Sequence, residues 1–490
     1  MARFSSILVL WCAWVVPAGA ATREVPITSH RLAGRLQVRH LPDMDSDVLA
    51  GRYEVFEDRR AASGRKIPLD IVVLPARTAT PAPEPLVFLA GGDLPPATQW
   101  AAFLEHAVDR LRDERDILLV DQRGTGESHR LDCQLPDPAS EPGAADDFAT
   151  WRAAMKRCRE NLSRRADLRL YTTPLAMDDL FEVCEWLGWS RVDLWGVSYG
   201  TKAARVYARQ HPGRVRTMVL FGVLPLAPST WTDRAHAAQR GLDRVLTDCE
   251  RDSSCDANFP DLDLEVDSLL ARAARAPVPL RVATPAHADR VVNVDDRWVR
   301  DRIEAALSYA ALRAELPYVL HAAYRGDWQP FARWIGPPAA ATEEGAAACL
   351  ACSEDFAQFD AKRAIASAAT TFWGDAPLRR QLATCEEWPR GWLPRAYFEP
   401  VTARVPALFL AGEVDHIAPP EYAEKTAWHW SGGRVLVLPG HGHADLDACV
   451  LELVQEFVHS GGKAVLEPPC ARQAPHFVTR AAELKPVARP

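Results

Sequence analysis

Short runs of apolar residues alternate with helix-like stretches along most of the chain. Apolar runs without a polar break are typical of strands buried on both faces, and helices between them predict a mostly parallel sheet. The first segments instead alternate in polarity, which favours an antiparallel start to that sheet. The expected strands, in order, are 36–39, 51–56, 69–74, 86–89, 117–120, 191–194, 217–221, 407–410 and 434–438.

Helical periodicity separates many of these strands. Residues 225–400 differ, because they are rich in Ala, Arg and Trp and show no clear strand alternation. We expect this stretch to form a helical cap inserted into an α/β core with helices on both faces of the sheet. Residues 21–224 would supply the first part of the core, and residues 401–490 its C-terminal part. The expected core helices are 98–112, 174–187, 202–210 and 447–459.

The start of the chain has the pattern of a signal peptide. Arg3 supplies a small positive segment, residues 7–16 are apolar but too few to span a bilayer, and residues 18–20 read Ala-Gly-Ala, a cleavage site. We therefore expect residues 1–20 to be removed and the protein to be exported to the periplasm or the medium. No later stretch reaches the length of a transmembrane helix, so no membrane span is expected after signal removal.

Composition narrows the classes of partner and cofactor. The formal net charge of −8 gives no electrostatic reason to expect nucleic acid as a partner. Loss of Cys12 with the signal peptide leaves an even number of the 11 cysteines, which in an exported chain suggests disulfides. Cys349 and Cys352 form a C-x-x-C pair, but Leu350 and Ala351 between them are apolar and no second pair has zinc spacing. No metal site is therefore expected.

The pattern G-x-S-x-G stands at residues 196–200, between a predicted strand and a predicted helix. This is the sequence form of a nucleophile elbow, a tight turn that exposes a serine at the edge of a sheet. Gly196 and Gly200 would let the strand and the helix approach closely. The bare pattern also occurs by chance, but its position here favours Ser198 as a catalytic nucleophile.

A serine nucleophile needs a base and an acid that orients the base, each expected after a later strand. After strand 407–410 a G-x-x-D turn places Asp415 as the predicted acid. Glu413 is the alternative acid, and its other interpretation is a solvated turn residue. His416, beside the acid, is expected to be a bystander.

The base is expected in the loop after strand 434–438, which contains two histidines. His443 is preferred, because Gly442 before it permits a tight approach and a helix begins soon after it. His441 is the alternative, and its other interpretation is an ordinary loop histidine. The predicted triad is therefore Ser198, His443 and Asp415.

An oxyanion hole needs two preorganised N–H donors. The amide of Tyr199, directly after the nucleophile, is one expected donor. The second is expected in the loop after strand 86–89, which begins with Gly91 and Gly92, and Gly92 is the preferred residue. A plain turn is the other interpretation of these two glycines.

Two motifs together resemble one enzyme family. Residues 121–128 read Asp-Gln-Arg-Gly-Thr-Gly-Glu-Ser, and with the elbow at 196–201 they resemble the proline iminopeptidase and tripeptidyl aminopeptidase family of α/β-hydrolases. Residues 412–415 and 442–443 fall where that family carries its acid and base, and the resemblance extends over residues 65–475. It implies an α/β-hydrolase fold and hydrolysis of peptides from their free N-terminus, without a metal or organic cofactor.

The cysteine-containing segments resemble the exported, tripeptidyl-aminopeptidase-like branch of that family. Two positions depart from it: Asp93 follows the two glycines where the family usually reads G-G-P-G, and Ala444 replaces a glycine after the histidine. Neither change removes a catalytic group. Arg123 is expected to brace the loop after its strand. The expected disulfides are Cys133–Cys158, Cys249–Cys255, Cys352–Cys385 and Cys449–Cys470, with Cys184 and Cys349 left as thiols.

In this family, carboxylates of the cap hold the α-ammonium group of the substrate. The candidates are Glu354, Asp355, Glu386 and Glu387, and Glu354 is preferred. A bridge between the two cysteine loops would let Glu354 and Glu386 line one pocket that faces Ser198. The other interpretation of each is a surface carboxylate.

The sequence thus predicts an exported serine aminopeptidase that acts on a peptide or small acyl substrate through an acyl-enzyme. A carboxylesterase with the same triad is the alternative, because the triad specifies acyl transfer but not the leaving group. A third hypothesis is a catalytically silent binding protein, which the intact catalytic residues disfavour. Substrate side chain and oligomeric state are not specified by the sequence.

Overall fold

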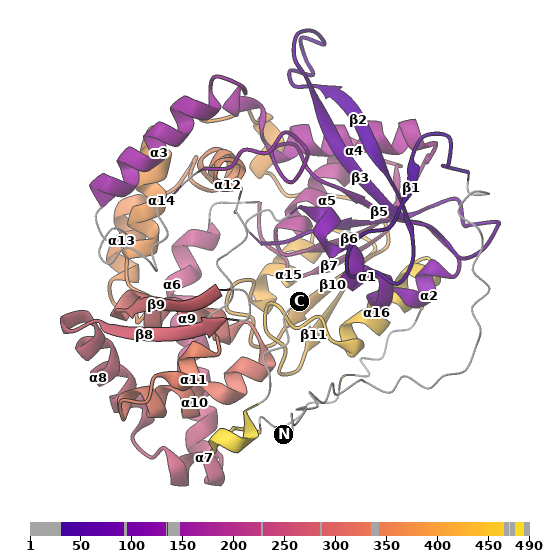
Figure 1. Ribbon diagram of the computed structural model, residues 1–490. Helices are drawn as coiled ribbons and strands as arrows, with labels where there is room; N and C mark the ends of the chain where they lie inside the picture. The colour runs from indigo at the N-terminus through magenta and orange to yellow at the C-terminus, as the bar shows by residue number, and fades with distance from the viewer. Residues whose placement is uncertain are drawn as a thin grey trace, which may run out of the picture.

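A computed structural model describes residues 31–92, 96–133, 135, 148–226, 229–284, 287–334, 343–464, 470 and 476–484. The expected signal peptide at residues 1–20 lies outside them. Within these ranges, no helix has the length and apolar character needed to cross a bilayer. The described chain forms a sheet covered by helices and, beside it, a group of further helices with one hairpin (Figure 1).

Nine strands of the described chain form one sheet, in the order β1-β2-β3-β5-β4-β6-β7-β10-β11. The first three neighbouring pairs, up to β3 with β5, are antiparallel, and all later pairs are parallel. The strands are β1 (Gln37–Arg39), β2 (Val48–Phe56), β3 (Lys66–Leu74), β4 (Leu86–Leu89), β5 (Ile117–Val120), β6 (Val192–Val197), β7 (Val215–Phe221), β10 (Ala407–Gly412) and β11 (Gly433–Leu438).

Helices cover both faces of this sheet because its central strands are apolar on both sides. One face packs against α4 (Thr173–Leu187), α5 (Tyr199–Gln210) and α15 (Pro420–Ala427). The other face packs against α1 (Ala101–Ala107), α2 (Asp109–Arg112) and α16 (Ala448–His459). This arrangement confirms the predicted α/β fold with a mostly parallel sheet. The expected single helix over 98–112 is divided into η2 (Ala97–Trp100), α1 and α2.

The inserted cap has its own apolar core, largely separate from the two cores of the sheet. Its helical elements follow β7 and end before β10. They are α6 (Ser229–Arg251), α7 (Ser253–Asn258), α8 (Leu262–Arg275), α9 (Asp296–Leu307), α10 (Ala310–Tyr324), α11 (Gln329–Ala332), α12 (Glu344–Leu350), the π-helical turn η4 (Ala351–Asp355), α13 (Ala361–Ala368), α14 (Ala376–Glu387) and η5 (Arg395–Phe398).

The predicted helical cap is not wholly helical. β8 (Val278–Thr284) and β9 (His287–Val294) form an antiparallel hairpin within it. Leu280, Val292 and Val294 of this hairpin are buried in the core of the cap, which explains why these short segments take up strand structure.

Two segments outside residues 225–400 also lie with the cap, so the division expected from the sequence is too simple. α3 (Phe148–Leu162) packs along α14, and Figure 1 shows the two helices side by side. Near the end of the chain, Phe477 is buried in the core of the cap, and the Val478 N–H donates to the Ala314 carbonyl at 2.9 Å.

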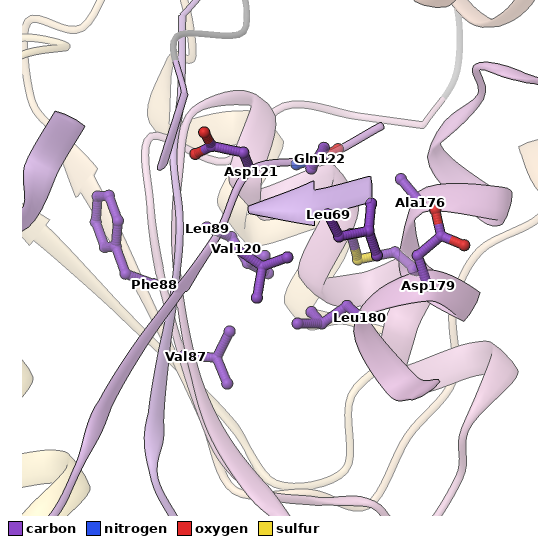
Figure 2. Close-up of a pocket in the computed structure, with 11 residues that line it drawn as sticks. Leu69, Val87, Phe88, Leu89, Val120, Asp121, Gln122, Ala176, Asp179 and Leu180 are labelled. Atoms are coloured by element: carbon purple, nitrogen blue, oxygen red, sulfur yellow. The ribbon is translucent and has the colours of Figure 1, made fainter. Parts of the chain in front are cut away.

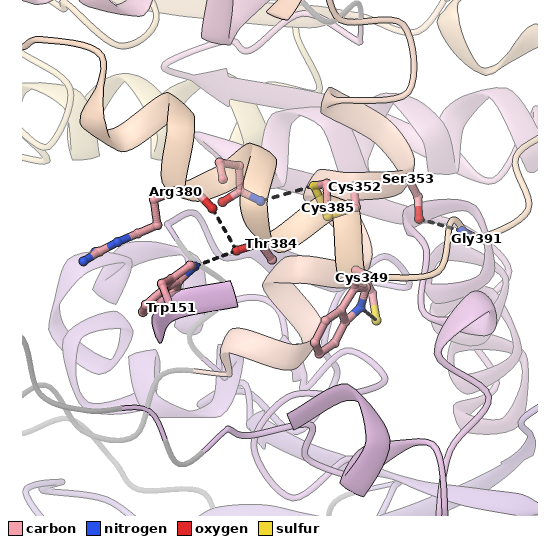
Figure 3. Close-up of a disulfide and its surroundings, with 10 residues drawn as sticks. Trp151, Cys349, Cys352, Ser353, Arg380, Thr384, Cys385 and Gly391 are labelled. Carbon is pink, nitrogen blue, oxygen red and sulfur yellow. Dashed lines mark hydrogen bonds between the residues drawn. A yellow bond between two sulfur atoms is a disulfide. The ribbon is translucent and has the colours of Figure 1, made fainter. Parts of the chain in front are cut away.

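The structure pairs eight cysteines as the sequence analysis expects. Cys133–Cys158 joins the segment after β5 to α3, and Cys352–Cys385 joins η4 to α14 (Figure 3). The other two bridges are Cys249–Cys255 and Cys449–Cys470, and Cys184 and Cys349 are buried thiols.

Candidate active site

Ser198 occupies the turn between β6 and α5, in a backbone conformation that few residues adopt. Its φ is 52° and its ψ is −116°, so the turn holds a non-glycine residue in the left-handed half of backbone space. A Cβ atom on Gly196 would lie 2.5 Å from the Gly200 carbonyl oxygen, and one on Gly200 would overlap the Leu89 carbonyl oxygen. The two glycines therefore permit the close approach that a nucleophile elbow needs.

Three predicted residues meet at this turn in one hydrogen-bonded row. His443 Nε2 lies 2.8 Å from Ser198 Oγ, and His443 Nδ1 lies 2.8 Å from Asp415 Oδ2. The Asp415 side chain is fully buried, and that of His443 is 11% exposed. The row has the geometry in which an imidazole can take a proton from a serine while a carboxylate orients the ring.

Backbone groups keep Asp415 ionised beside His443. Its Oδ1 accepts the N–H groups of Ile417 at 2.9 Å and Ala418 at 2.7 Å. Burial acts to raise the pKa of Asp415, but the facing His443 and these N–H donors outweigh burial and lower the pKa below its ordinary value. Glu413, the alternative acid, instead accepts the Gly440 N–H at 2.9 Å.

The loop that carries His443 is held by the cap. Gly442 lies directly against Arg313 of α10 and against the Ser308 carbonyl, with no space for a side chain. The Ala444 N–H donates to that same Ser308 carbonyl at 3.0 Å. His441, the alternative base, points elsewhere: its ring contacts the Pro439 carbonyl and Asp447.

The ring of His416, expected to be a bystander, lies toward the cap. It is 3% exposed, and its Nε2 lies 3.8 Å from Glu304 on α9. Glu304 also binds Arg234 at 2.7 Å, so His416 lies against an ion pair of the cap.

The two segments that carry the predicted oxyanion donors both adjoin Ser198. A Cβ atom on Gly91 would come within 2.7 Å of the Ser198 Cβ, so this glycine packs directly on the elbow. Gly92 follows with φ 78°, a left-handed conformation that favours glycine. Tyr199 is the first residue of α5, where backbone N–H groups have no partner within the helix. Asp93 and the rest of that loop lie outside the described residues.

Two side chains of the loop after β5 hold it to neighbouring elements. Asp121 Oδ1 accepts the Thr98 N–H at 2.9 Å, and its Oδ2 accepts the Thr98 hydroxyl at 3.1 Å, which ties the loop to η2. Arg123 braces the same loop, as expected: it is 3% exposed and binds both oxygens of Asp179 at 2.6 and 2.8 Å.

A small apolar cavity lies beneath this loop, between β4, β5 and α4 (Figure 2). Asp121 and Gln122 stand at its upper end, and Leu69, Val87 and Leu180 lie around it (Figure 2). Neither Ser198 nor His443 lines it, so this cavity belongs to the packing of the core and is not a substrate pocket.

The prediction that Glu354 and Glu386 line one amine-binding pocket is wrong. The Glu386 side chain is 58% exposed and pairs with Arg152 of α3 at 3.2 Å, on the outside of the cap. Glu387 pairs with the same arginine at 2.7 Å. Glu354 is buried at 2% exposure, so Glu354 and Glu386 do not line one pocket. Asp355 forms an ion pair with Lys202 of α5.

Two family models match the chain. One, described as alpha/beta hydrolase fold, matches residues 88–257, and the second, described as TAP-like protein, matches residues 370–470. The chain has the α/β-hydrolase fold. Residues 370–470 of this chain are similar to TAP-like proteins.

Curated relatives and solved structures are similar to parts of this α/β-hydrolase. It is 26% identical over 176 residues to "Putative hydrolase YuaR" of Escherichia coli and 29% identical over 159 residues to "Proline iminopeptidase" of Neisseria gonorrhoeae. These matches cover 35% and 32% of this chain, and only 35% and 38% of the relatives' own lengths.

Two solved structures align with most of this α/β-hydrolase at low identity. A proline iminopeptidase of Mycobacterium smegmatis aligns over 84% of this chain and 99% of its own, with 18% identity and a TM-score of 0.44. An esterase of Thermogutta terrifontis aligns over 84% of this chain and 100% of its own, with 18% identity and a TM-score of 0.38.

Within the described ranges, no three His, Cys, Asp or Glu side chains are grouped so as to hold a metal ion.

Proposed function

We propose that this protein is a serine hydrolase in which Ser198 attacks the carbonyl carbon of the substrate. His443 Nε2, 2.8 Å from Ser198 Oγ, takes the serine proton, and Asp415 stabilises the imidazolium that forms. The N–H groups of Tyr199 and Gly92 bind the developing oxyanion. His443 then gives its proton to the leaving group, and water releases the acyl group from Ser198 by the same steps. The hydrogen-bonded row on the strained elbow is the observation that carries this proposal.

We further propose that the substrates are peptides with a free N-terminus. The TAP-like match over residues 370–470 and the similarity to a proline iminopeptidase support this substrate class. The chemistry calls for no metal or organic cofactor, because proton transfer and oxyanion binding use groups of the chain.

The test compares aminoacyl and tripeptidyl amides with their N-acetylated forms and with simple acyl esters. An aminopeptidase is expected to cleave the free-amine compounds and to lose activity on the acetylated ones, because a desolvated ammonium group needs a charged or polar partner in its site. Equal turnover of acetylated peptides or simple esters would overturn the aminopeptidase proposal.

One observation favours the carboxylesterase as the second candidate. Glu386 lies on the surface and Glu354 is fully engaged in the interior, so the expected two-carboxylate pocket for an ammonium group does not form. In the same substrate panel, a carboxylesterase would prefer the neutral esters and would not respond to acetylation.

A catalytically silent binding protein is disfavoured by the complete row of Ser198, His443 and Asp415. A fluorophosphonate probe tests this directly, because an active serine is labelled and a silent one is not. Export remains part of the proposal and is supported by the four disulfides. N-terminal sequencing of protein from the periplasm or medium is expected to begin at Ala21.

A further inference from the structure

Glu354 begins a buried hydrogen-bond path that leads from the cap toward Ser198. Its Oε1 accepts the backbone N–H of Thr173 at 2.7 Å, and its Oε2 lies 2.9 Å from the Thr173 hydroxyl. The Tyr397 hydroxyl also donates to Oε2. Thr173 is the first residue of α4, so the carboxyl group satisfies a backbone donor that the start of this helix leaves unpaired. The group faces α4 and not a substrate pocket.

The path continues from Thr173 to the residue beside the nucleophile. The Thr173 hydroxyl lies 2.8 Å from the Tyr199 hydroxyl, which in turn lies 3.1 Å from Gln122 Oε1. The ring of Tyr199 is thereby held between two elements, α4 and the loop after β5. Because the backbone N–H of the same residue is an oxyanion donor, a fixed ring also fixes the position of that donor.

The far end of the path is anchored in the cap. Glu354 lies on η4, which the Cys352–Cys385 bridge ties to α14 (Figure 3). The neighbouring Ser353 hydroxyl accepts the Gly391 N–H at 2.8 Å, a contact that Figure 3 also shows. The turn that presents Glu354 is therefore held on both sides, and it has little freedom to move away from α4.

The path is unbroken from Gln122 to Glu354. Three oxygen–oxygen contacts, of 3.1, 2.8 and 2.9 Å, join Gln122, Tyr199, Thr173 and Glu354 in turn. Burial raises the pKa of Glu354, although the Tyr397 and Thr173 donors act to lower it.

We propose that Glu354 is a positioning residue that holds Tyr199, and with it the oxyanion hole, through the hydroxyl of Thr173. This inference rests on the proposed serine hydrolase function and assigns Glu354 a different part from amine binding. The cap thereby contributes to acyl transfer itself, in addition to covering the site.

Three substitutions test the path. Tyr199→Phe removes the central hydroxyl and keeps the backbone donor, so kcat should fall about 10-fold for esters and free-amine peptides alike, with KM nearly unchanged. Glu354→Leu removes the end of the path and should cause a similar fall in kcat. Glu354→Gln retains an acceptor for the Thr173 N–H and can donate an N–H to the Thr173 hydroxyl, so it keeps the path closed and should keep kcat within about threefold.

The Tyr199→Phe, Glu354→Leu double variant should lose little more kcat than either single variant, because both break the same path. Glu386→Gln, on the surface, is the matched control and should leave kcat and KM unchanged. Thermal unfolding and fluorophosphonate labelling separate a folding failure from a positioning defect.

Two outcomes overturn the proposal. A loss in Glu354→Gln confined to free-amine peptides would make Glu354 an amine-binding carboxylate, and unchanged kcat in Tyr199→Phe would show that the path positions nothing. Failure of the underlying serine hydrolase function is a separate result, since the unmodified protein would then show no turnover and no fluorophosphonate labelling, or Ser198→Ala would retain activity.

Discussion

Two histidines stand two positions apart in the loop after β11, and their surroundings give them different chemistry. His443 lies between Ser198 and Asp415, whereas His441 contacts Asp447 and the Pro439 carbonyl. The hydrogen bond to Asp447, stronger in effect than burial, raises the pKa of His441. The raised pKa favours the protonated form of His441, and its ring faces Asp447 and not Ser198.

Substitution of the two histidines should therefore separate them. Ser198→Ala and His443→Ala should each lower kcat by several orders of magnitude, because either change removes a group that acts in every turnover. His441→Ala should lower kcat by less than about 10-fold. Steady-state kinetics with one ester and one peptide substrate measure these effects, and the reverse ranking of the two histidines would disprove the assignment.

The buried carboxyl group of Asp121 should make the free energy of unfolding depend on pH. Burial raises the pKa of Asp121 to about 7, so the folded protein binds this proton more readily than the unfolded chain. The free energy of unfolding should consequently fall as the pH rises from about 4 to about 7. Asp121→Asn keeps the acceptor for the Thr98 N–H and removes this titration.

Urea unfolding of both proteins at about pH 5 and about pH 8 measures the effect. The wild type should lose on the order of 1–3 kcal/mol more stability across this interval than Asp121→Asn. Contributions of other groups cancel in the comparison, so parallel curves for the two proteins would show that Asp121 does not titrate there.

At the scale of elements, local pattern predicts strands and turns whose burial is complete. β4 and β5 are buried along their whole length, and an uninterrupted run of four apolar residues predicts each of them. The β8–β9 hairpin gave a weaker signal, because only its inward positions, such as Leu280 and Val292, are fixed by burial. The structure of α3 depends on contact with α14, more than 200 positions later in the chain, which local pattern cannot report.

The same distinction applies to the candidate site. The elbow and the positions of Asp415 and His443 follow from strand order and short motifs, so the sequence places them. The surroundings of Glu354 and Glu386 depend on which way a turn and a helix face after the cap folds. Glu386 meets Arg152 of α3, and nothing local to either residue indicates that pairing.

Close packing of β4, β6 and α5 can be tested with one glycine. Gly200→Ala would drive a methyl group into the Leu89 carbonyl oxygen, which no side-chain rotation relieves. We expect a loss of about 2 kcal/mol or more of stability, together with a large loss of activity. Gly34→Ala is the control, since a Cβ atom there meets nothing within 4 Å. Comparable melting temperatures for the two variants would contradict the packing argument.

At the scale of the whole molecule, the cap supports the site from two directions. Arg313 and Ser308 hold the loop of His443, and Glu354 on η4 contacts the start of α4 beside Tyr199. The two supports lie on different cap elements, so damage to one should leave the other in place.

Removal of the Cys352–Cys385 bridge tests the support at η4. Replacing both cysteines with alanine removes a bridge between residues 33 positions apart and should lower the free energy of unfolding by about 4 kcal/mol. We expect kcat to fall for esters as well as for peptides. The control removes the Cys249–Cys255 bridge, whose cysteines are only 6 positions apart, and should lower the free energy of unfolding by about 2 kcal/mol without changing kcat. Urea unfolding and kinetics on both substrates measure the two effects, and equal changes in kcat would argue against a special part for η4.

The packing of α3 against α14, with Phe477 in the core of the cap, has a consequence for protein engineering. Residues 225–400 cannot be exchanged between proteins as a self-contained unit. A chimaera that exchanges them for the lid of a relative would leave one apolar face of α3 without its packing partner and would expose Phe477 to water. A graft that folds must instead carry three pieces together: Phe148–Leu162, the insertion itself and residues 476–484.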